Sequence, residues 1–143
     1  MLTQVTKFID QIYMLGTRRI ALFSLGPVGC VPARALLPGA PINRCFGKMN
    51  LMVKKYNKGR TGMFDFSDVS SACCGGGTIG GLLQCGKEGY KTCANPNEFL
   101  FWDYFHPSEH AYRLISKALW GGKKYRIRPL NLKALANITL TGV

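Results

Sequence analysis

Two residues of this chain, Asp103 and His106, have types and a spacing that suit acid–base chemistry. They lie in the stretch FLFWDYFHPSEHAYRLI, residues 99–115, between a short apolar run and a helical pattern. A carboxylate on such a turn can accept a hydrogen bond from one imidazole nitrogen. That bond fixes the tautomer and stabilises the imidazolium that forms when the other nitrogen takes a proton. The pair is therefore a candidate catalytic acid and base.

Two other interpretations fit the same stretch. Asp103 could bond to backbone N–H groups of the turn while His106 enters the helix, which is the usual role of a D-x-x-H sequence. His106 and His110 could instead hold a metal ion, but the stretch lacks the glutamate of an H-E-x-x-H motif, and Pro107 sets His106 at the helix boundary. We predict no metal site and no cofactor. The residues alone leave the turn and the catalytic interpretations open.

The surrounding elements indicate an α/β fold. Apolar residues recur at helical spacing over residues 3–15, from about 46 to 57 and from 107 to 120, with Thr3 as a candidate cap for the first helix. Continuous apolar runs at residues 20–23 and 99–102 are typical of strands covered on both faces. Helices alternating with such strands predict a layered α/β fold with an open sheet. Ligand sites of these sheets lie at the carboxyl ends of the strands, where Asp103 and His106 stand.

Two long segments are predicted to be loops. Residues 26–45 hold too many prolines and glycines for a regular element, and residues 70–97 combine seven glycines with four cysteines. Residues 63–69 are ambiguous between strand and loop. The run CGGGTIGG resembles a phosphate loop only weakly, because it lacks the GK[ST] ending.

The cysteines indicate disulfides and an oxidising compartment. Their number is even, and they lie in loop sequence: Cys30, Cys45, Cys73, Cys74, Cys85 and Cys93. Adjacent Cys73 and Cys74 suit a single tetrahedral zinc ion poorly. The pairing itself cannot be read from the spacing.

Length and apolar content indicate how many domains the chain forms, and net charge indicates which partners it attracts. A chain of 143 residues with 47% apolar content fits one domain, predicted over residues 1–122, followed by a basic tail over 123–143. The net charge of +12 favours anionic surfaces, namely nucleic acid, lipid headgroups or acidic polysaccharide, and charge alone does not choose among them. An anionic cell-wall polymer is one candidate partner. The chain lacks the interleaved basic and aromatic residues that are typical of a nucleic-acid-binding module.

No apolar run is long enough for a transmembrane segment or a signal peptide. Asn137 begins an N-x-T glycosylation sequon.

Four blocks resemble a known family. TRRIALFSLGPVGCVP, KYNKG, ACCGGG and TCANPNEFLFWDYFHPSEHAY occur in the order found in the carboxyl-terminal portion of plant GDSL esterases/lipases, members of the SGNH hydrolase superfamily. The resemblance runs from about residue 1 to 120. It implies a secreted protein with a three-layer α/β/α sandwich around a parallel sheet. It also implies hydrolysis of carboxylic esters or lipids through a Ser-Asp-His triad. By motif position, Asp103 is the triad acid and His106 the triad base.

The chain departs from the family pattern at the nucleophile. No Gly-Asp-Ser block occurs, and the blocks that carry the oxyanion glycine and asparagine are also absent. None of the serines (Ser24, Ser67, Ser70, Ser71, Ser108 and Ser116) is predicted to lie on a strand-to-helix elbow. The segment between KYNKG and ACCGGG is shorter than the corresponding segment in the family, which indicates an internal deletion. We therefore expect an incomplete sandwich that lacks its N-terminal strands, from a sequence that begins inside a larger gene product.

Two alternatives to a hydrolase remain at this stage. The first is a catalytically inactive secreted fragment or binding protein that uses its basic surface. The second, weaker, is a nucleic-acid-associated protein with metal-coordinated cysteines.

Overall fold

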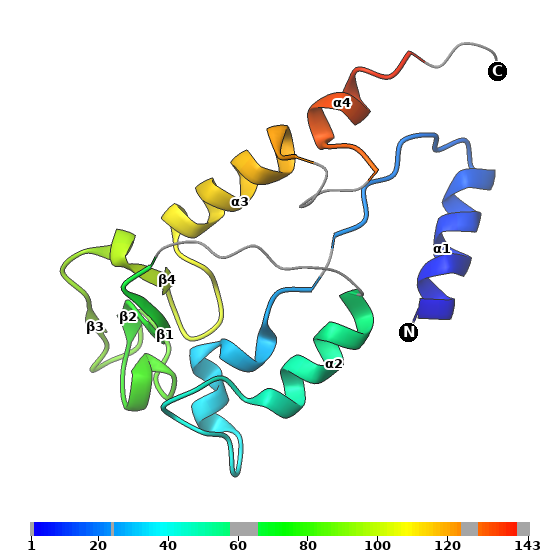
Figure 1. Ribbon diagram of the computed structural model, residues 1–143. Helices are drawn as coiled ribbons and strands as arrows, with labels where there is room; N and C mark the ends of the chain where they lie inside the picture. The colour runs from blue at the N-terminus through cyan, green and yellow to red at the C-terminus, as the bar shows by residue number, and fades with distance from the viewer. Residues whose placement is uncertain (1, 24, 58–65, 124–128, 140–143) are drawn as a thin grey trace.

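A computed structural model describes residues 2–23, 25–57, 66–123 and 129–139 (Figure 1). Its helices are α1 (Leu2–Met14), α2 (Gly47–Asn57), α3 (Glu109–Gly121) and α4 (Leu132–Ala136). Its strands are β1 (Asp68–Ala72), β2 (Cys74–Gly75), β3 (Lys91–Thr92) and β4 (Phe99–Phe101). Short 3-10 turns are η1 (Val28–Cys30), η2 (Pro32–Leu36), η3 (Thr78–Gly80) and η4 (Pro96–Glu98).

Strands β1 and β4 form a parallel pair. Asp68 lies opposite Phe99 and Ala72 opposite Phe101, with an irregularity between them. The pairing continues past β1, because the amides of Cys73 and Cys74 donate to the carbonyls of Phe101 (3.0 Å) and Trp102 (2.6 Å). The predicted α/β class with a parallel sheet is confirmed, and in the described residues this parallel sheet consists of one pair. The ambiguous segment 63–69 becomes a strand from Asp68, and residues 63–65 lie outside the described residues.

The predicted helix after β4 is confirmed as α3, but it begins at Glu109 rather than at Pro107. Ser108 is its N-cap and is fully buried. The Ser108 hydroxyl accepts a hydrogen bond from the Ala111 amide (3.2 Å) and donates one to the Phe99 carbonyl (2.7 Å). A capping oxygen normally satisfies only its own helix. This one also fastens the helix to the strand that precedes it.

The helices predicted at 3–15 and 46–57 are confirmed as α1 and α2. Because α1 begins at Leu2, Thr3 lies inside the helix and is not its cap. Gly16 follows α1 with φ of +96°, a conformation that glycine adopts at low cost. On α2, Val53 of the predicted apolar stripe is buried.

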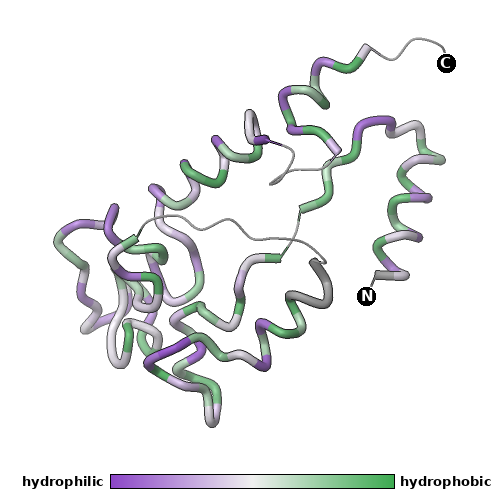
Figure 2. The backbone as a smooth tube through the Cα atoms, viewed as in Figure 1, coloured by the Kyte–Doolittle hydropathy of each residue, from purple (hydrophilic) through white to green (hydrophobic). Residues whose placement is uncertain are grey.

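The strand predicted at residues 20–23 is wrong. These residues belong to no helix or strand, and Leu22 and Phe23 are exposed. They form one wall of an apolar groove of about 320 Å³, whose other walls include Leu119, Leu132 and Leu135 of α3 and α4. Figure 2 shows the segment as a hydrophobic stretch beside these helices. A buried parallel strand needs neighbours on both sides, and the described residues provide none here.

Three disulfides pin the loops, as the cysteine content predicts. They join Cys30 to Cys45, Cys73 to Cys93 and Cys74 to Cys85. The pairing that the sequence left open is thus resolved, and no cysteine remains free as a zinc ligand. The interpretation with metal-coordinated cysteines is therefore wrong.

The two loops are joined to each other by a close backbone approach. A Cβ atom on Gly81 would lie 2.1 Å from the Pro32 carbonyl oxygen. No real side chain tolerates that distance, so only glycine permits η2 and η3 to pack this closely.

Arg34 of η2 is completely buried, which sequence patterns did not reveal. Its guanidinium donates to the carbonyls of Cys30, Val31, Pro41, Ile42 and Ser70 and to the Ser70 hydroxyl. Burial lowers the pKa of Arg34, and the charge of nearby Asp68 partly offsets this effect. An arginine stays protonated even so. The side chain therefore joins the loop around η1 and η2 to strand β1.

The carboxyl-terminal residues contain α4, which packs on α3. The Asn131 amide donates to the Gly122 carbonyl (3.1 Å), and its oxygen caps α4 at Ala134 (2.9 Å). Lys124, Arg126 and Arg128 lie outside the described residues. The boundary between a domain over 1–122 and a tail over 123–143 stays a prediction. Among the described helices, none combines the length and apolarity that crossing a bilayer requires.

Replacing Arg34 by methionine tests its role. The substitution keeps much of the volume but leaves several buried carbonyls without a donor, so we expect the free energy of unfolding to fall by about 3–5 kcal/mol. Urea unfolding with intact disulfides measures the change. Arg44→Met, at an exposed position, is the matched control and should change stability by less than about 0.5 kcal/mol. Equal effects of the two substitutions would contradict the role.

Mapping of the unreduced protein tests the pairing of the adjacent cysteines. Because no protease cuts between Cys73 and Cys74, tandem mass spectrometry must fragment that peptide bond. We expect Cys73 linked to Cys93 and Cys74 to Cys85. The Cys30–Cys45 link, which is separable by digestion, serves as the internal standard. A Cys73–Cys85 link would contradict the structure.

Candidate active site

Asp103 and His106 lie on a tight loop at the carboxyl end of β4. The loop closes where the Trp102 amide donates to the His106 carbonyl (2.9 Å). Phe101 then bridges to Pro107, and the Ser108 amide donates to the Leu100 carbonyl (2.8 Å). The chain thus turns back along its own strand before α3 begins. This geometry sets both side chains at the sheet edge where the sequence predicts a site.

The Asp103 carboxylate bonds both to its turn and to the histidine ring. Oδ1 accepts the amides of Phe105 (2.9 Å) and His106 (2.6 Å). Oδ2 lies 2.9 Å from Nδ1 of His106. The sequence left two interpretations of Asp103 open: a turn residue that bonds to backbone amides, and a carboxylate that orients the His106 imidazole. The structure contains the contacts that each interpretation requires. The backbone hydrogen bonds that shape the loop also hold the carboxylate within hydrogen-bond distance of Nδ1 of His106.

The environment keeps Asp103 ionised. Its side chain is 16% exposed, against 62% for His106. Burial raises the pKa of Asp103. Hydrogen bonds from the His106 amide and ring and from the Phe105 amide lower it by more than burial raises it, so the pKa lies below its ordinary value. An ionised carboxylate only accepts, so Nδ1 is assigned as the donor of this bond. In the neutral ring, Nε2 then has a free lone pair that can accept a proton.

Neighbouring loops anchor the Asp103–His106 loop. The Tyr104 carbonyl accepts the amide of Ala33 (2.7 Å), and the Tyr104 hydroxyl accepts from the side chain of Gln84. The Phe105 ring meets the His106 ring edge-on, with centroids 5.7 Å apart. Sequence reasoning missed these anchors, because they come from segments distant along the chain. Trp102, whose side chain the sequence left unassigned, is 37% exposed at the loop entrance.

His110 does not join the pair. It lies on α3, where its ring meets Phe66 edge-on at 5.6 Å. Over the described residues, no three His, Cys, Asp or Glu side chains group in a way that could hold a metal ion.

The serines that the structure describes take structural roles or form no hydrogen bond with the histidine. The Ser108 hydroxyl donates a hydrogen bond to the Phe99 carbonyl and accepts one from the Ala111 amide. The Ser70 hydroxyl accepts a hydrogen bond from Arg34. The hydrogen bonds of His106 in the described residues go to Asp103 and Trp102, and none goes to a serine hydroxyl. Ser24 lies outside the described residues. The structure therefore brings together the acid and the base without a serine beside them.

A parallel strand that ends in a carboxylate-bound histidine is an arrangement of hydrolases that act through a histidine base. Comparison with known proteins gives the family. The chain belongs to the GDSL-like lipase/acylhydrolase family, whose model matches residues 1–119. The resemblance seen in the four sequence blocks is thereby confirmed.

Similar proteins from Arabidopsis thaliana carry the same family name. The chain is 59% identical to GDSL esterase/lipase 6 over 172 aligned positions, which cover 99% of this chain and 48% of that protein. It is 26% identical to GDSL esterase/lipase 4 over 91% of this chain and 44% of that protein. GDSL esterase/lipase 3 is 27% identical over 96% of this chain and 47% of that protein.

The chain spans about half the length of the curated relatives it matches. The alignment with GDSL esterase/lipase 6 covers 172 positions, more than the 143 residues of this chain, so the relative has extra residues inside the matched region. This finding agrees with the predicted internal shortening. No solved structure matches the chain.

Replacing Asp103 by asparagine tests the carboxylate. Because folding lowers the pKa of Asp103, its ionised form stabilises the protein above the ordinary aspartate pKa of about 3.9. That stability is lost as the pH falls through the lower folded value. We expect Asp103→Asn to lower the free energy of unfolding by about 1 kcal/mol near neutral pH and the gap to close in acid.

Urea unfolding at a series of pH values measures this gap. Asp10→Asn, at an exposed position on α1, is the control and should show little difference at any pH. A gap for Asp103→Asn that persists unchanged into acid would show that the charge is not its cause.

Proposed function

We propose that this protein is part of a carboxylic ester hydrolase in which Asp103 and His106 are the acid and base of a Ser-Asp-His triad. One observation carries the proposal: the 2.9 Å contact between Asp103 Oδ2 and His106 Nδ1 at the carboxyl end of β4. Membership of the GDSL-like lipase/acylhydrolase family supports the reaction class.

The proposed mechanism follows from the protonation of the pair. His106 Nε2 takes the proton of a serine hydroxyl as that oxygen attacks the ester carbonyl. Asp103, which stays ionised, stabilises the imidazolium that results. His106 then returns the proton to the leaving alcohol, and a water molecule releases the acid by the same route. The exposed histidine ring is open to both serine and substrate.

The serine of this triad belongs to a segment that the 143 residues do not contain. No Gly-Asp-Ser sequence occurs in the chain, and no described serine forms a hydrogen bond with His106. The relatives named above are about twice as long as their matched regions. We place the nucleophile and the oxyanion donors in the unmatched half of the family domain. A lone His106 then has no hydroxyl to activate.

We further propose that the protein is secreted. Three disulfides support an oxidising compartment. Asn137, at the carboxyl end of α4, is exposed, as a glycosylation acceptor must be. Glycosylation of Asn137 stays a prediction, and so does an anionic cell-wall polymer as a partner.

A fusion tests the catalytic roles. The amino-terminal half of Arabidopsis GDSL esterase/lipase 6, joined to this chain, supplies the unmatched half of the domain. We expect it to hydrolyse p-nitrophenyl butyrate, and we expect His106→Ala and Asp103→Asn to lower kcat/KM by about 10³- to 10⁴-fold, as in other triads. The chain alone should hydrolyse no more ester than its own His106→Ala variant.

The second histidine supplies the matched control. His110→Ala in the same fusion should stay within about threefold of the parent, because His110 packs on Phe66 and, in the described residues, forms no hydrogen bond or ion pair with Asp103 or His106. Loss of activity in His110→Ala but not in His106→Ala would overturn the assignment. Ester hydrolysis by the chain alone that depends on His106 would overturn the placement of the serine.

A further inference from the structure

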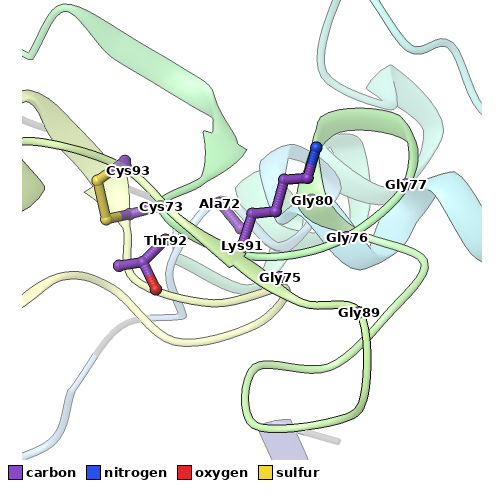
Figure 3. Close-up of a pocket in the computed structure, with 10 residues that line it drawn as sticks. All are labelled: Ala72, Cys73, Gly75, Gly76, Gly77, Gly80, Gly89, Lys91, Thr92 and Cys93. Atoms are coloured by element: carbon purple, nitrogen blue, oxygen red, sulfur yellow. A yellow bond between two sulfur atoms is a disulfide. The ribbon is translucent and has the colours of Figure 1, made fainter.

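A second cavity lies apart from Asp103 and His106. It measures about 400 Å³ and opens between the glycine-rich turn after β2 and strand β3 (Figure 3). Its lining consists of Ala72, Cys73, Gly75, Gly76, Gly77, Gly80, Gly89, Lys91, Thr92 and Cys93. It coincides with the run CGGGTIGG, which the catalytic site does not use.

The cavity is built mainly from backbone that is held in place. Gly77 and Gly80 have φ of +71° and +65°, which L residues rarely adopt, so side chains are kept out of the space. The Cys73–Cys93 disulfide forms part of the wall, and Cys74–Cys85 fixes the other end of the turn. A ligand therefore meets a formed surface and does not have to order a loop.

The polar groups of the cavity favour an anion. Lys91 provides the one charged side chain in the lining, and it forms no ion pair with a carboxylate in the described part of the chain. Figure 3 shows Lys91 reaching from β3 toward the turn that holds Gly77 and Gly80. The Gly77 amide donates to no acceptor within the described residues. Thr92 adds a hydroxyl, which can donate or accept.

We propose that this cavity binds a uronate residue of an acidic polysaccharide, with Lys91 on the sugar carboxylate and with Thr92 and glycine backbone groups on its hydroxyls. A lipid is disfavoured because the lining contains no long apolar side chain for an acyl tail. The net charge of +12 adds long-range attraction for a polyanion. Binding does not depend on the proposed catalytic roles, since none of the lining residues belongs to the Asp103–His106 loop.

Isothermal titration with trigalacturonate at low salt tests the proposal. We expect saturable binding, about five- to tenfold weaker in Lys91→Gln and about threefold weaker in Thr92→Val. Lys117→Gln removes the same charge from an exposed position on α3 and should change the affinity less than twofold. The fully methyl-esterified trimer should not bind, because its carboxylates are masked.

Three results would overturn the proposal. The first is no binding of trigalacturonate to the parent chain. The second is equal weakening by Lys91→Gln and Lys117→Gln, which would mean attraction by net charge without a site. The third is binding to phosphatidylserine vesicles that depends on Lys91 while trigalacturonate does not bind, which would assign the cavity to a lipid headgroup.

Discussion

The described fold depends on one buried cation. Arg34 has no exposed surface, and its guanidinium satisfies carbonyls on both sides of a proline-rich loop as well as Ser70 on β1. A buried charge costs several kcal/mol unless every donor is bonded, so the loop must keep the conformation that supplies these acceptors. Asp68 lowers the cost, because its carboxylate faces the same region. The loop in turn bonds to Tyr104 and thereby supports the turn that holds Asp103 and His106.

The two proposed sites are built on this same framework from different residues. The Asp103–His106 loop extends from β4, whose partner is the chain around β1 and the adjacent cysteines. The glycine-lined cavity lies on the other side of Cys73 and Cys74, where β2 pairs with β3. Two disulfides leave this dipeptide in different directions. One short stretch of backbone thus positions a carboxylate-bound histidine and a backbone-lined pocket.

Local patterns predicted helices α1, α2 and α3, a strand at 99–102 that the structure contains as Phe99–Phe101, and the disulfide content, because periodicity and composition report these directly. Helix α4 was not predicted, because its five residues lie in a stretch that the sequence assigned to the tail. Local patterns also placed Asp103 and His106 on one turn, since three residues of spacing and a following proline limit where they can lie. The strand at 20–23 failed because pairing depends on partners elsewhere. Arg34 was missed for the same reason: a basic residue in a loop looks solvated until distant carbonyls surround it. Ser108 was placed inside the helix from residue 107, and neither its role as N-cap nor its bond to Phe99 was predicted.

The apolar segment at residues 20–23 makes the behaviour of the protein sensitive to salt. Leu22 and Phe23 are exposed, and burying either side chain would gain about 1.5–3 kcal/mol, so two chains that meet at this segment attract each other. The net charge of +12 opposes the encounter. Added salt shortens the range of that repulsion to about 8–10 Å without weakening the apolar attraction. Colloidal stability in dilute buffer therefore comes from charge, and self-association is expected to increase as ionic strength increases.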